Sequence, residues 1–80
     1  MNKVEVRLFA SLRKYHAKPG SSEAMIIELD DKTPLGSLVG RLKVPPEEVT
    51  VIMVNGKREP VTYSLQDGDR VGIFPLIGGG

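Results

Sequence analysis

The sequence has the hydrophobic period of a helix in one place only. The apolar residues there recur at i, i+3, i+4 and i+7, which places them on one helical stripe: Leu35, Leu38, Val39 and Leu42. We expect Thr33 to be the N-cap, Pro34 to be the first helical residue, and the prolines at 45 and 46 to end the helix. Because a chain of 80 residues forms one small domain, a single helix of this kind must bury its stripe against a sheet.

Two glycines lie within this helix. Gly36 and Gly40 each lower its stability by roughly 1 kcal/mol relative to alanine. The helix therefore depends on docking against the sheet, and the absence of a side chain at these positions allows a close approach.

Two stretches before the helix alternate between apolar and polar residues, as half-buried strands do. The apolar positions are Val4, Val6 and Leu8 in the first stretch and Met25, Ile27 and Leu29 in the second. A polar connection closed by Pro19 and Gly20 separates them, and its lone histidine, His16, is expected at the surface. We expect the two strands to form an antiparallel hairpin.

Three strands are expected after the helix. The first precedes Asn55 and Gly56, a dipeptide typical of a tight hairpin because both residues tolerate positive φ, and a short strand follows near residues 58–61. The turn at residues 67–69 then leads into a last strand over residues 70–74. The expected order of elements is β-β-α-β-β-β.

This order matches the β-grasp architecture of ubiquitin-like domains, an α+β fold. In it, a mixed sheet of four or five strands packs on one main helix, and the first and last strands are parallel neighbours at the centre. We assign residues 1–75 to the β-grasp domain and residues 76–80 to a flexible C-terminal glycine tail.

Two phenylalanines are out of phase with the core positions of their strands. If Val71 and Ile73 face the core, Phe74 faces the opposite side, and Phe9 does the same at the end of the first strand. Parallel neighbouring strands would bring both rings to one edge of the sheet. There, with Ile52 and Val54 extending the patch, they would form a docking surface. The alternative is that both rings fold inward.

Charge and composition argue against several classes of function. Eleven basic and ten acidic side chains give a net charge of +1, and aromatic residues make up 5% of the chain, which does not suggest nucleic-acid binding. No apolar stretch has the length of a membrane span, and no cysteine is present to form a disulfide or a thiolate metal site. No acidic group has the spacing of a metal-binding loop. We expect a cytoplasmic protein that binds no metal, nucleic acid or membrane.

Directly after the apolar residues Leu76 and Ile77, the sequence ends on three glycines: Gly78, Gly79 and Gly80. Glycine can enter a narrow channel and lets backbone groups approach a partner closely. Residues 75–80 span at most about 20 Å when extended, which is enough to carry the terminal carboxylate into a partner. The alternatives are a frayed end and a cloning remnant.

Several stretches together resemble the sulfur-carrier proteins of the MoaD/ThiS family, and MoaD more than ThiS. They are "LFASLR" at the end of the first strand, "VNG" at the hairpin, "QDGDRVGIFP" at the last strand, and the glycine terminus. The resemblance covers essentially the whole chain and implies a carrier rather than an enzyme.

The resemblance also implies a chemistry for the chain end. An activating enzyme of the MoeB/ThiF type, related to ubiquitin E1, would use ATP and Mg²⁺ to adenylate the terminal carboxylate. A sulfur donor would then convert the adenylate to a thiocarboxylate, and the chain itself would bind no cofactor. In a MoaD-like system, the thiocarboxylate enters a large subunit of the MoaE type and gives its sulfur to the precursor of molybdopterin.

Individual residues match the pattern of the family. Gly79 and Gly80 correspond to its Gly-Gly end, with Gly80 bearing the reactive carboxylate, and Gly78 is a third glycine where the family usually has another residue. A mature end at Gly79 would make Gly80 an overhang that must be removed. The residues implied in partner binding are Phe9, Arg13, Phe74, Pro75, Leu76 and Ile77, with a solvated surface role as the alternative for Arg13.

Other functions use the same features. An activated C-terminal glycine also suits a ubiquitin-like modifier that is conjugated to lysines, and an inert tail suits a simple ubiquitin-like interaction module. Within the carrier class, sulfur delivery to thiamin, cysteine or tRNA remains open beside the molybdenum or tungsten cofactor.

Overall fold

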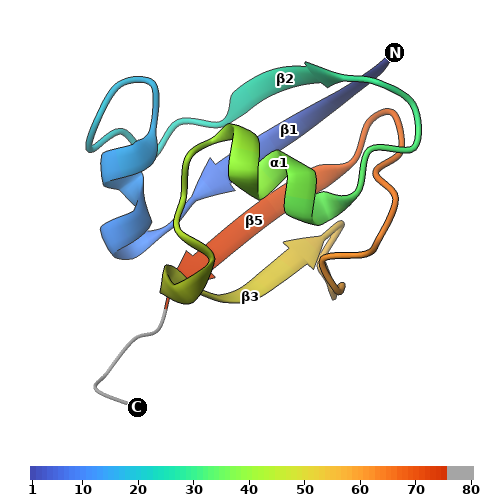
Figure 1. The fold of residues 1–80 in the computed structure, drawn as a ribbon. Helices are drawn as coiled ribbons and strands as arrows, with labels where there is room; N and C mark the ends of the chain where they lie inside the picture. Colours follow the sequence, from blue (N-terminus) through green and yellow to red (C-terminus); the bar gives the residue numbers. More distant parts are fainter. Residues whose placement is uncertain (76–80) are drawn as a thin grey trace.

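A computed structural model of the chain describes residues 1–75, so the expected tail at 76–80 lies outside the described residues. The elements are β1 (Asn2–Leu8), η1 (Ala10–Tyr15), β2 (Met25–Leu29), α1 (Leu35–Arg41), η2 (Pro46–Glu48), β3 (Val49–Val54), β4 (Lys57–Arg58) and β5 (Arg70–Pro75) (Figure 1). Their order confirms the predicted β-β-α-β-β-β arrangement. The two 3₁₀-helices, η1 and η2, were not predicted.

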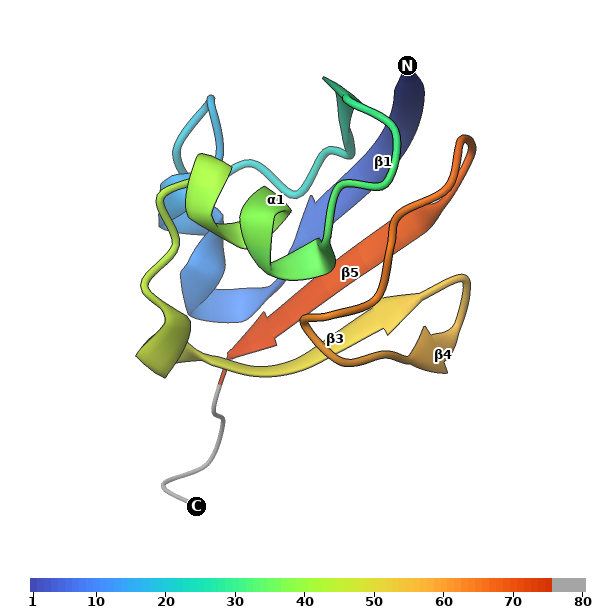
Figure 2. The ribbon, with the colours of Figure 1, turned by 45° about the vertical axis from the view of Figure 1, so that its right-hand side comes forward.

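The five strands form one mixed sheet in the order β2-β1-β5-β3-β4. β1 and β5 are parallel neighbours, with Val6 opposite Val71 and Leu8 opposite Ile73, and the remaining neighbours are antiparallel. Figures 1 and 2 show α1 lying across one face of this sheet. The α+β β-grasp architecture predicted from the order of elements is therefore confirmed.

The core lies between the sheet and α1. The alternating residues of β1 and β5 are buried as expected, and α1 contributes the stripe Leu35, Leu38 and Val39. Ile52 and Val54 also belong to this core, with only 5% and 2% of their surface exposed, so the prediction that they extend an outer patch is wrong.

Both ends of α1 differ from the prediction. Pro34, not Thr33, is the N-cap, because the Thr33 hydroxyl instead donates to the carbonyl of Asp30. The helix ends at Arg41, before the two prolines. Lys43 then adopts a left-handed backbone conformation, with a φ of 61°. The proline at 46 instead begins η2.

The first backbone N–H groups of α1 bond outside the helix. The N–H of Leu35 donates to the carbonyl of Tyr63 at 2.8 Å, and that of Gly36 donates to the carbonyl of Val61 at 2.9 Å. These bonds satisfy N–H groups that have no partner within the helix. They hold residues 61–63 against the helix, so β4 ends at Arg58 instead of continuing to Val61 as predicted.

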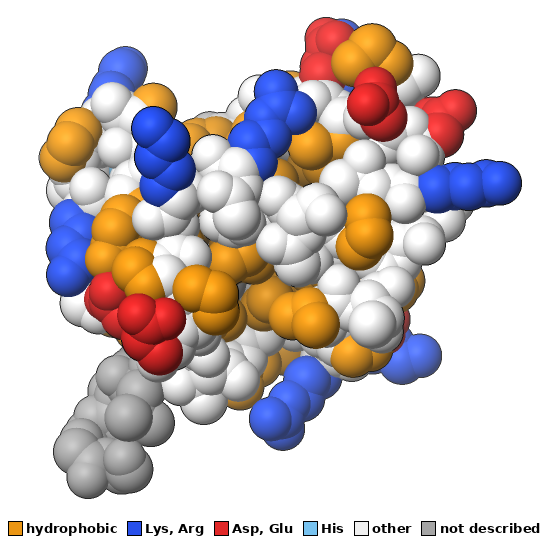
Figure 3. Space-filling model, viewed as in Figure 1, with side chains coloured by type: hydrophobic (Ala, Val, Ile, Leu, Met, Phe, Trp, Pro, Cys, Tyr) orange, Lys and Arg blue, Asp and Glu red, His pale blue; other side chains and the backbone are white. Residues whose placement is uncertain are grey.

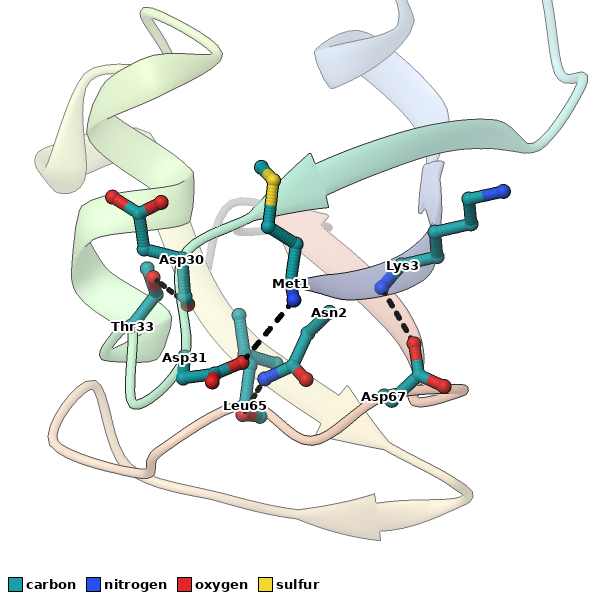
Figure 4. A network of polar contacts seen from close by, with 8 residues as sticks. All are labelled: Met1, Asn2, Lys3, Asp30, Asp31, Thr33, Leu65 and Asp67. Carbon is teal, nitrogen blue, oxygen red and sulfur yellow. Dashed lines mark hydrogen bonds and ion pairs between the residues drawn. The ribbon is translucent and has the colours of Figure 1, made fainter.

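A polar network fastens the N-terminal end of β1 to the loop before β5 (Figure 4). The side-chain amide of Asn2 donates to the carbonyl of Leu65 at 3.0 Å, and the backbone N–H of Lys3 donates to Oδ1 of Asp67 at 2.8 Å. The amino group of Met1 lies 3.6 Å from Oδ1 of Asp31. This end of the sheet is opposite to the end at which β5 stops (Figure 1).

Asp69 is buried and connects two turns. Its carboxylate accepts hydrogen bonds from the Asn55 amide at 2.9 Å, the Tyr63 hydroxyl at 3.0 Å and the backbone N–H of Gln66 at 2.8 Å. Three donors compensate the loss of hydration that burial of a carboxylate requires. The turn before β5 is thereby joined to the hairpin of β3 and β4, where Asn55 takes the expected positive φ of 54°.

His16 is buried, with 7% of its surface exposed, so the expectation of a surface histidine is wrong. Its Nδ1 accepts the backbone N–H of Lys18 at 2.8 Å, and its Nε2 lies 3.0 Å from the carbonyl of Glu23. A neutral imidazole that accepts at one nitrogen donates at the other, so the ring can make both hydrogen bonds. His16 thereby links Lys18 to Glu23 within the connection between η1 and β2. Within residues 1–75, no helix has the length and apolar character needed to cross a membrane.

Candidate functional site

The ends of β1 and β5 meet because the two strands are parallel and adjacent. Phe9 follows β1, and its backbone N–H donates to the carbonyl of Ile73 at 3.2 Å. The rings of Phe9 and Phe74 stack with their centroids 4.3 Å apart and an angle of 6° between their planes. The prediction that both rings lie at the same edge of the sheet is confirmed.

The two rings lie on the face of the sheet away from α1. Ile73 is fully buried in the core, so Phe74 next to it points to the opposite face, where it is half-buried. Phe9 is 36% exposed, and the alternative that both rings fold inward is therefore wrong.

Gly72 provides the seat for this aromatic pair. A Cβ at Gly72 would lie 3.1 Å from Cε2 of Phe9 and 3.2 Å from Cε1 of Phe74, closer than carbon atoms normally pack. The glycine therefore allows the rings to lie flat against the backbone of β5.

Around the aromatic pair, the outer face of the sheet holds a shallow depression of about 450 Å³. Met53 lines it together with the charged residues Glu5, Arg7 and Arg70. Nε of Arg70 lies 3.8 Å from Oε2 of Glu5. Met53 takes the place that the sequence analysis gave to Ile52 and Val54, because Met53 pairs with Gly72 on this face. An apolar centre with a charged rim is typical of a protein-docking surface.

The other predicted partner-binding residues are distributed differently. Arg13 is exposed on η1, where its Nε donates to the carbonyl of Ala10 at 3.3 Å. Pro75 is buried as the last residue of β5, opposite Val49. The predicted tail residues lie outside the described part of the chain: Leu76, Ile77, Gly78, Gly79 and Gly80.

A second link braces the same end of the sheet. The Tyr15 hydroxyl in η1 donates to Oε2 of Glu48 in η2 at 2.6 Å, and Nζ of Lys14 lies 3.6 Å from Oε1 of Glu48. The hydrogen bond to Glu48, followed by burial and the charges of Glu48 and Glu47, raises the pKa of Tyr15. No local pattern in the sequence predicts this link, because the two residues are 33 positions apart.

Within residues 1–75, no group of three or more histidine or acidic side chains is arranged to hold a metal ion. The outer face of the sheet around Phe9 and Phe74 instead presents stacked aromatic rings, a methionine and a charged rim. In chemical terms, it offers a contact surface next to the point at which residues 76–80 begin.

Comparisons with known proteins agree with this fold. A family model described as Mut7-C ubiquitin matches residues 1–78. Among solved structures, the Pyrococcus furiosus protein described as molybdopterin converting factor, subunit 1, is 28% identical with a TM-score of 0.75, and the alignment covers 96% of this chain and 100% of that one. None of the curated proteins matches this sequence.

Two further structures are similar over their whole length. The complex of subunits 1 and 2 of molybdopterin-converting factor from Helicobacter pylori 26695 gives 25% identity and a TM-score of 0.59, covering 98% of this chain and 99% of that one. The small archaeal modifier protein 1 from Methanosarcina acetivorans gives 25% identity and a TM-score of 0.63, covering 100% of this chain and 98% of that one. These similarities confirm the resemblance to the MoaD/ThiS type of ubiquitin-like protein.

Proposed function

This chain belongs to the Mut7-C ubiquitin family, and we propose that it is a sulfur carrier that acts through the C-terminal carboxylate of Gly80. One observation carries the proposal. The stacked rings of Phe9 and Phe74 form an exposed contact surface at the end of β5, directly before the glycine-containing residues 76–80. The similarity to the molybdopterin converting factor subunit from Pyrococcus furiosus supports it.

The position of the aromatic pair explains how the chain would work. A partner that contacts Phe9 and Phe74 holds the domain at the root of the tail, while residues 75–80 reach at most about 20 Å when extended. That length allows the carboxylate to react inside the partner while the domain stays outside. Glycine suits such a tail because it has no side chain to obstruct a narrow channel.

The carboxylate needs activation because hydroxide is a poor leaving group. In the proposed first step, a carboxylate oxygen of Gly80 attacks the α-phosphorus of ATP on an E1-like enzyme of the MoeB/ThiF type, which uses Mg²⁺, and pyrophosphate leaves. In the second step, hydrosulfide attacks the carbonyl carbon and AMP leaves, which produces the thiocarboxylate. A persulfide donor would first give an acyl disulfide, which a thiol then reduces to the same product.

The proposed acceptor is the pterin precursor of molybdopterin, bound by a large subunit of the MoaE type. The complex of two molybdopterin-converting factor subunits from Helicobacter pylori supports a partner of this kind. In this role the chain is a carrier and not a catalyst. Because the proposed steps consume ATP and thiols, we place the protein in the cytoplasm.

A second candidate function is protein modification. The similarity to the small archaeal modifier protein 1 of Methanosarcina acetivorans favours it. The adenylated carboxylate of Gly80 would then be transferred to the amino group of a lysine, and an isopeptide bond would form with loss of AMP. The contact surface at Phe9 and Phe74 would serve the activating enzyme in both cases.

Intact-mass measurement tests the proposal. The chain is incubated with its activating enzyme, ATP and a sulfide donor, and a carrier gains the mass difference between one sulfur and one oxygen atom. Conjugates of higher mass on lysine-containing proteins, without that gain, would favour the modifier. No change under conditions in which the enzyme consumes ATP would refute both.

A further inference from the structure

β3 has an open edge along its first half. On one side it pairs with β5, but on the other β4 pairs only with Met53 and Val54. Beyond these two residues, the described part of the chain makes one more hydrogen bond on this side of β3. The N–H of Glu59 donates to the carbonyl of Ile52 at 3.1 Å. No described strand pairs with Thr50, which lies at an irregularity of the ladder. Apart from the bonded Ile52 carbonyl, no described strand pairs with residues 49–52 on the side away from β5, and an edge left in this way accepts an added strand.

The chain itself holds this edge open. Pro60 has no N–H to continue the ladder, and the carbonyls of Val61 and Tyr63 accept the first N–H groups of α1. Gly36 allows this attachment, because a Cβ there would lie 3.3 Å from Cβ of Val61. If β4 extended along β3, the first N–H groups of α1 would therefore lose their carbonyl acceptors.

An apolar groove of about 500 Å³ lies beside the open edge, between α1 and β3. Its apolar lining comes from Val39 of α1, from Pro46 and Ile52, and from Val61, which is 58% exposed. In Figure 3, hydrophobic side chains occupy the band between α1 and β3 on this face of the molecule. Alternate side chains of an added strand would point into this groove.

The charges at the end of β4 distinguish the two sides of an added strand. Arg58 lies opposite Met53, so it is on the outer face of the sheet, where it is exposed and makes no ion pair within residues 1–75. A strand added in line with β4 would place its outward side chains beside Arg58 and its inward side chains in the groove. The edge therefore suits an acidic residue outward and a branched aliphatic residue inward.

We propose that the open edge of β3, together with this groove, binds an extended segment of a partner protein in which acidic and branched aliphatic residues alternate, by β-strand addition. This site goes beyond the proposed sulfur-carrier function, because it uses neither the tail nor the stacked rings of Phe9 and Phe74. A second copy of the chain suits the edge less well. Residues 49–52, which it would add, carry no acidic side chain for Arg58.

The test is a titration of the isotope-labelled full chain, followed by amide chemical shifts. The probe is a seven-residue peptide with blocked ends in which valine and aspartate alternate, and the control peptide has the same composition with its valines contiguous. We expect saturable shift changes at residues 49–52 and 58–61, and slower hydrogen exchange of the Ile52 amide. The proposal is overturned by equal binding of the control peptide, by shift changes centred on Phe9 and Phe74, or by the absence of saturable changes. It is also overturned if these amides shift with protein concentration alone, because that would indicate self-association.

A pair of variants tests the role of charge. Arg58→Glu should weaken binding of the alternating peptide about fivefold or more, the effect of losing and reversing an exposed ion pair. Lys57→Glu is the matched control, because it makes the same charge change at the adjacent exposed residue of β4, which lies opposite Val54 and so faces the other side of the sheet. We expect its affinity to stay near that of the unmodified chain. Equal weakening by both variants would contradict the pairing of Arg58 with an acidic side chain.

Discussion

The Tyr15 hydroxyl donates a hydrogen bond of 2.6 Å to Oε2 of Glu48 and so joins η1 to η2. Both 3₁₀-helices flank the end of β5 (Figure 1). The stacked rings of Phe9 and Phe74 lie at the same end of this strand. The bond raises the pKa of Tyr15 above its ordinary value of 10.0. The folded chain therefore holds this proton more tightly than the unfolded chain does.

Glu48→Gln should lower the pKa of Tyr15, because the amide keeps an acceptor but removes the charge. With the pKa raised in the folded state, the contribution to stability is complete below pH about 10 and is lost as the pH rises through the folded value. The chain has two tyrosines, so Tyr63→Phe gives a background in which tyrosinate absorbance reports Tyr15 alone. Glu47→Gln is the control and should lower the pKa less, since Glu47 is the smallest of the four causes. An unchanged titration of Glu48→Gln would contradict the hydrogen bond.

Gly72→Ala should displace the aromatic pair, because the new methyl group would lie 3.1 Å from Phe9 and 3.2 Å from Phe74. We expect the free energy of unfolding to fall by about 1–3 kcal/mol, the usual range for overpacking. Denaturant titration measures the loss, and ring-current shifts of the two phenylalanines report the displacement. Gly40→Ala is the matched control, since within residues 1–75 no atom outside its own helix and chain neighbours lies within 4 Å of its added Cβ. That control should stabilise the helix by about 0.5–1 kcal/mol. Equal changes in the free energy of unfolding for the two variants would contradict the close packing of the rings on Gly72.

The strands and their order were predictable because their signals are local. Val4, Val6 and Leu8 alternate with polar residues, and Asn55 with Gly56 specifies a tight hairpin, so neither needs information from distant residues. The position of Phe9 and Phe74 at one edge of the sheet was also predictable, once the first and last strands were expected to be parallel neighbours, whereas the stacking of their rings was not predicted.

The predictions were wrong where contacts between residues distant in the sequence determine the structure. β3 is apolar at every position from Val51 to Val54, so alternation could not tell which residues face the core, and pairing of Ile52 with Ile73 settles it. Likewise, the first turn of α1 takes its acceptors from Val61 and Tyr63, and this tertiary contact shortens β4. His16 is buried and makes a hydrogen bond to the carbonyl of Glu23, seven residues later in the chain. The segment between them is polar and was therefore expected to be an open loop.

Asp69→Ala should remove the acceptor shared by Asn55, Tyr63 and the N–H of Gln66. Leaving several partly buried donors without an acceptor should lower the free energy of unfolding by about 3 kcal/mol. Thermal and denaturant unfolding measure the change. Asp67→Ala is the control, because Asp67 is exposed and accepts one bond, from Lys3, so its loss should stay below about 1 kcal/mol. Comparable losses of unfolding free energy in the two variants would contradict the conclusion that the burial of Asp69 makes its hydrogen bonds important for stability.

Phe74→Ala should weaken binding to the activating enzyme more than it weakens the fold. The ring is half-buried and outside the core, so losing its stack on Phe9 should lower the free energy of unfolding by only about 0.5–1.5 kcal/mol. At the centre of an interface, the same change commonly lowers the binding free energy by about 2 kcal/mol or more. Calorimetry of binding and denaturant unfolding give the two values. Val61→Ala, an exposed apolar residue outside this face, should leave the binding unchanged. Equal losses of folding and binding for Phe74→Ala would mean that the ring serves the fold and not the partner.

Deleting Gly79 and Gly80 should abolish activation without lowering the melting temperature. The buried core and the hydrogen bonds described above join residues within 1–75, and we expect them to be sufficient for the fold. The deletion, however, withdraws the terminal carboxylate by two residues, about 7 Å of extended chain, from the position at which the partner would adenylate it. Intact mass after incubation with enzyme, ATP and sulfide measures the activation. Gly80→Ala keeps the length and tests whether the last residue must lack a side chain. A marked drop in melting temperature on deletion would assign the glycines a structural role, and thiocarboxylate formation on the shortened chain would contradict Gly80 as the reactive end.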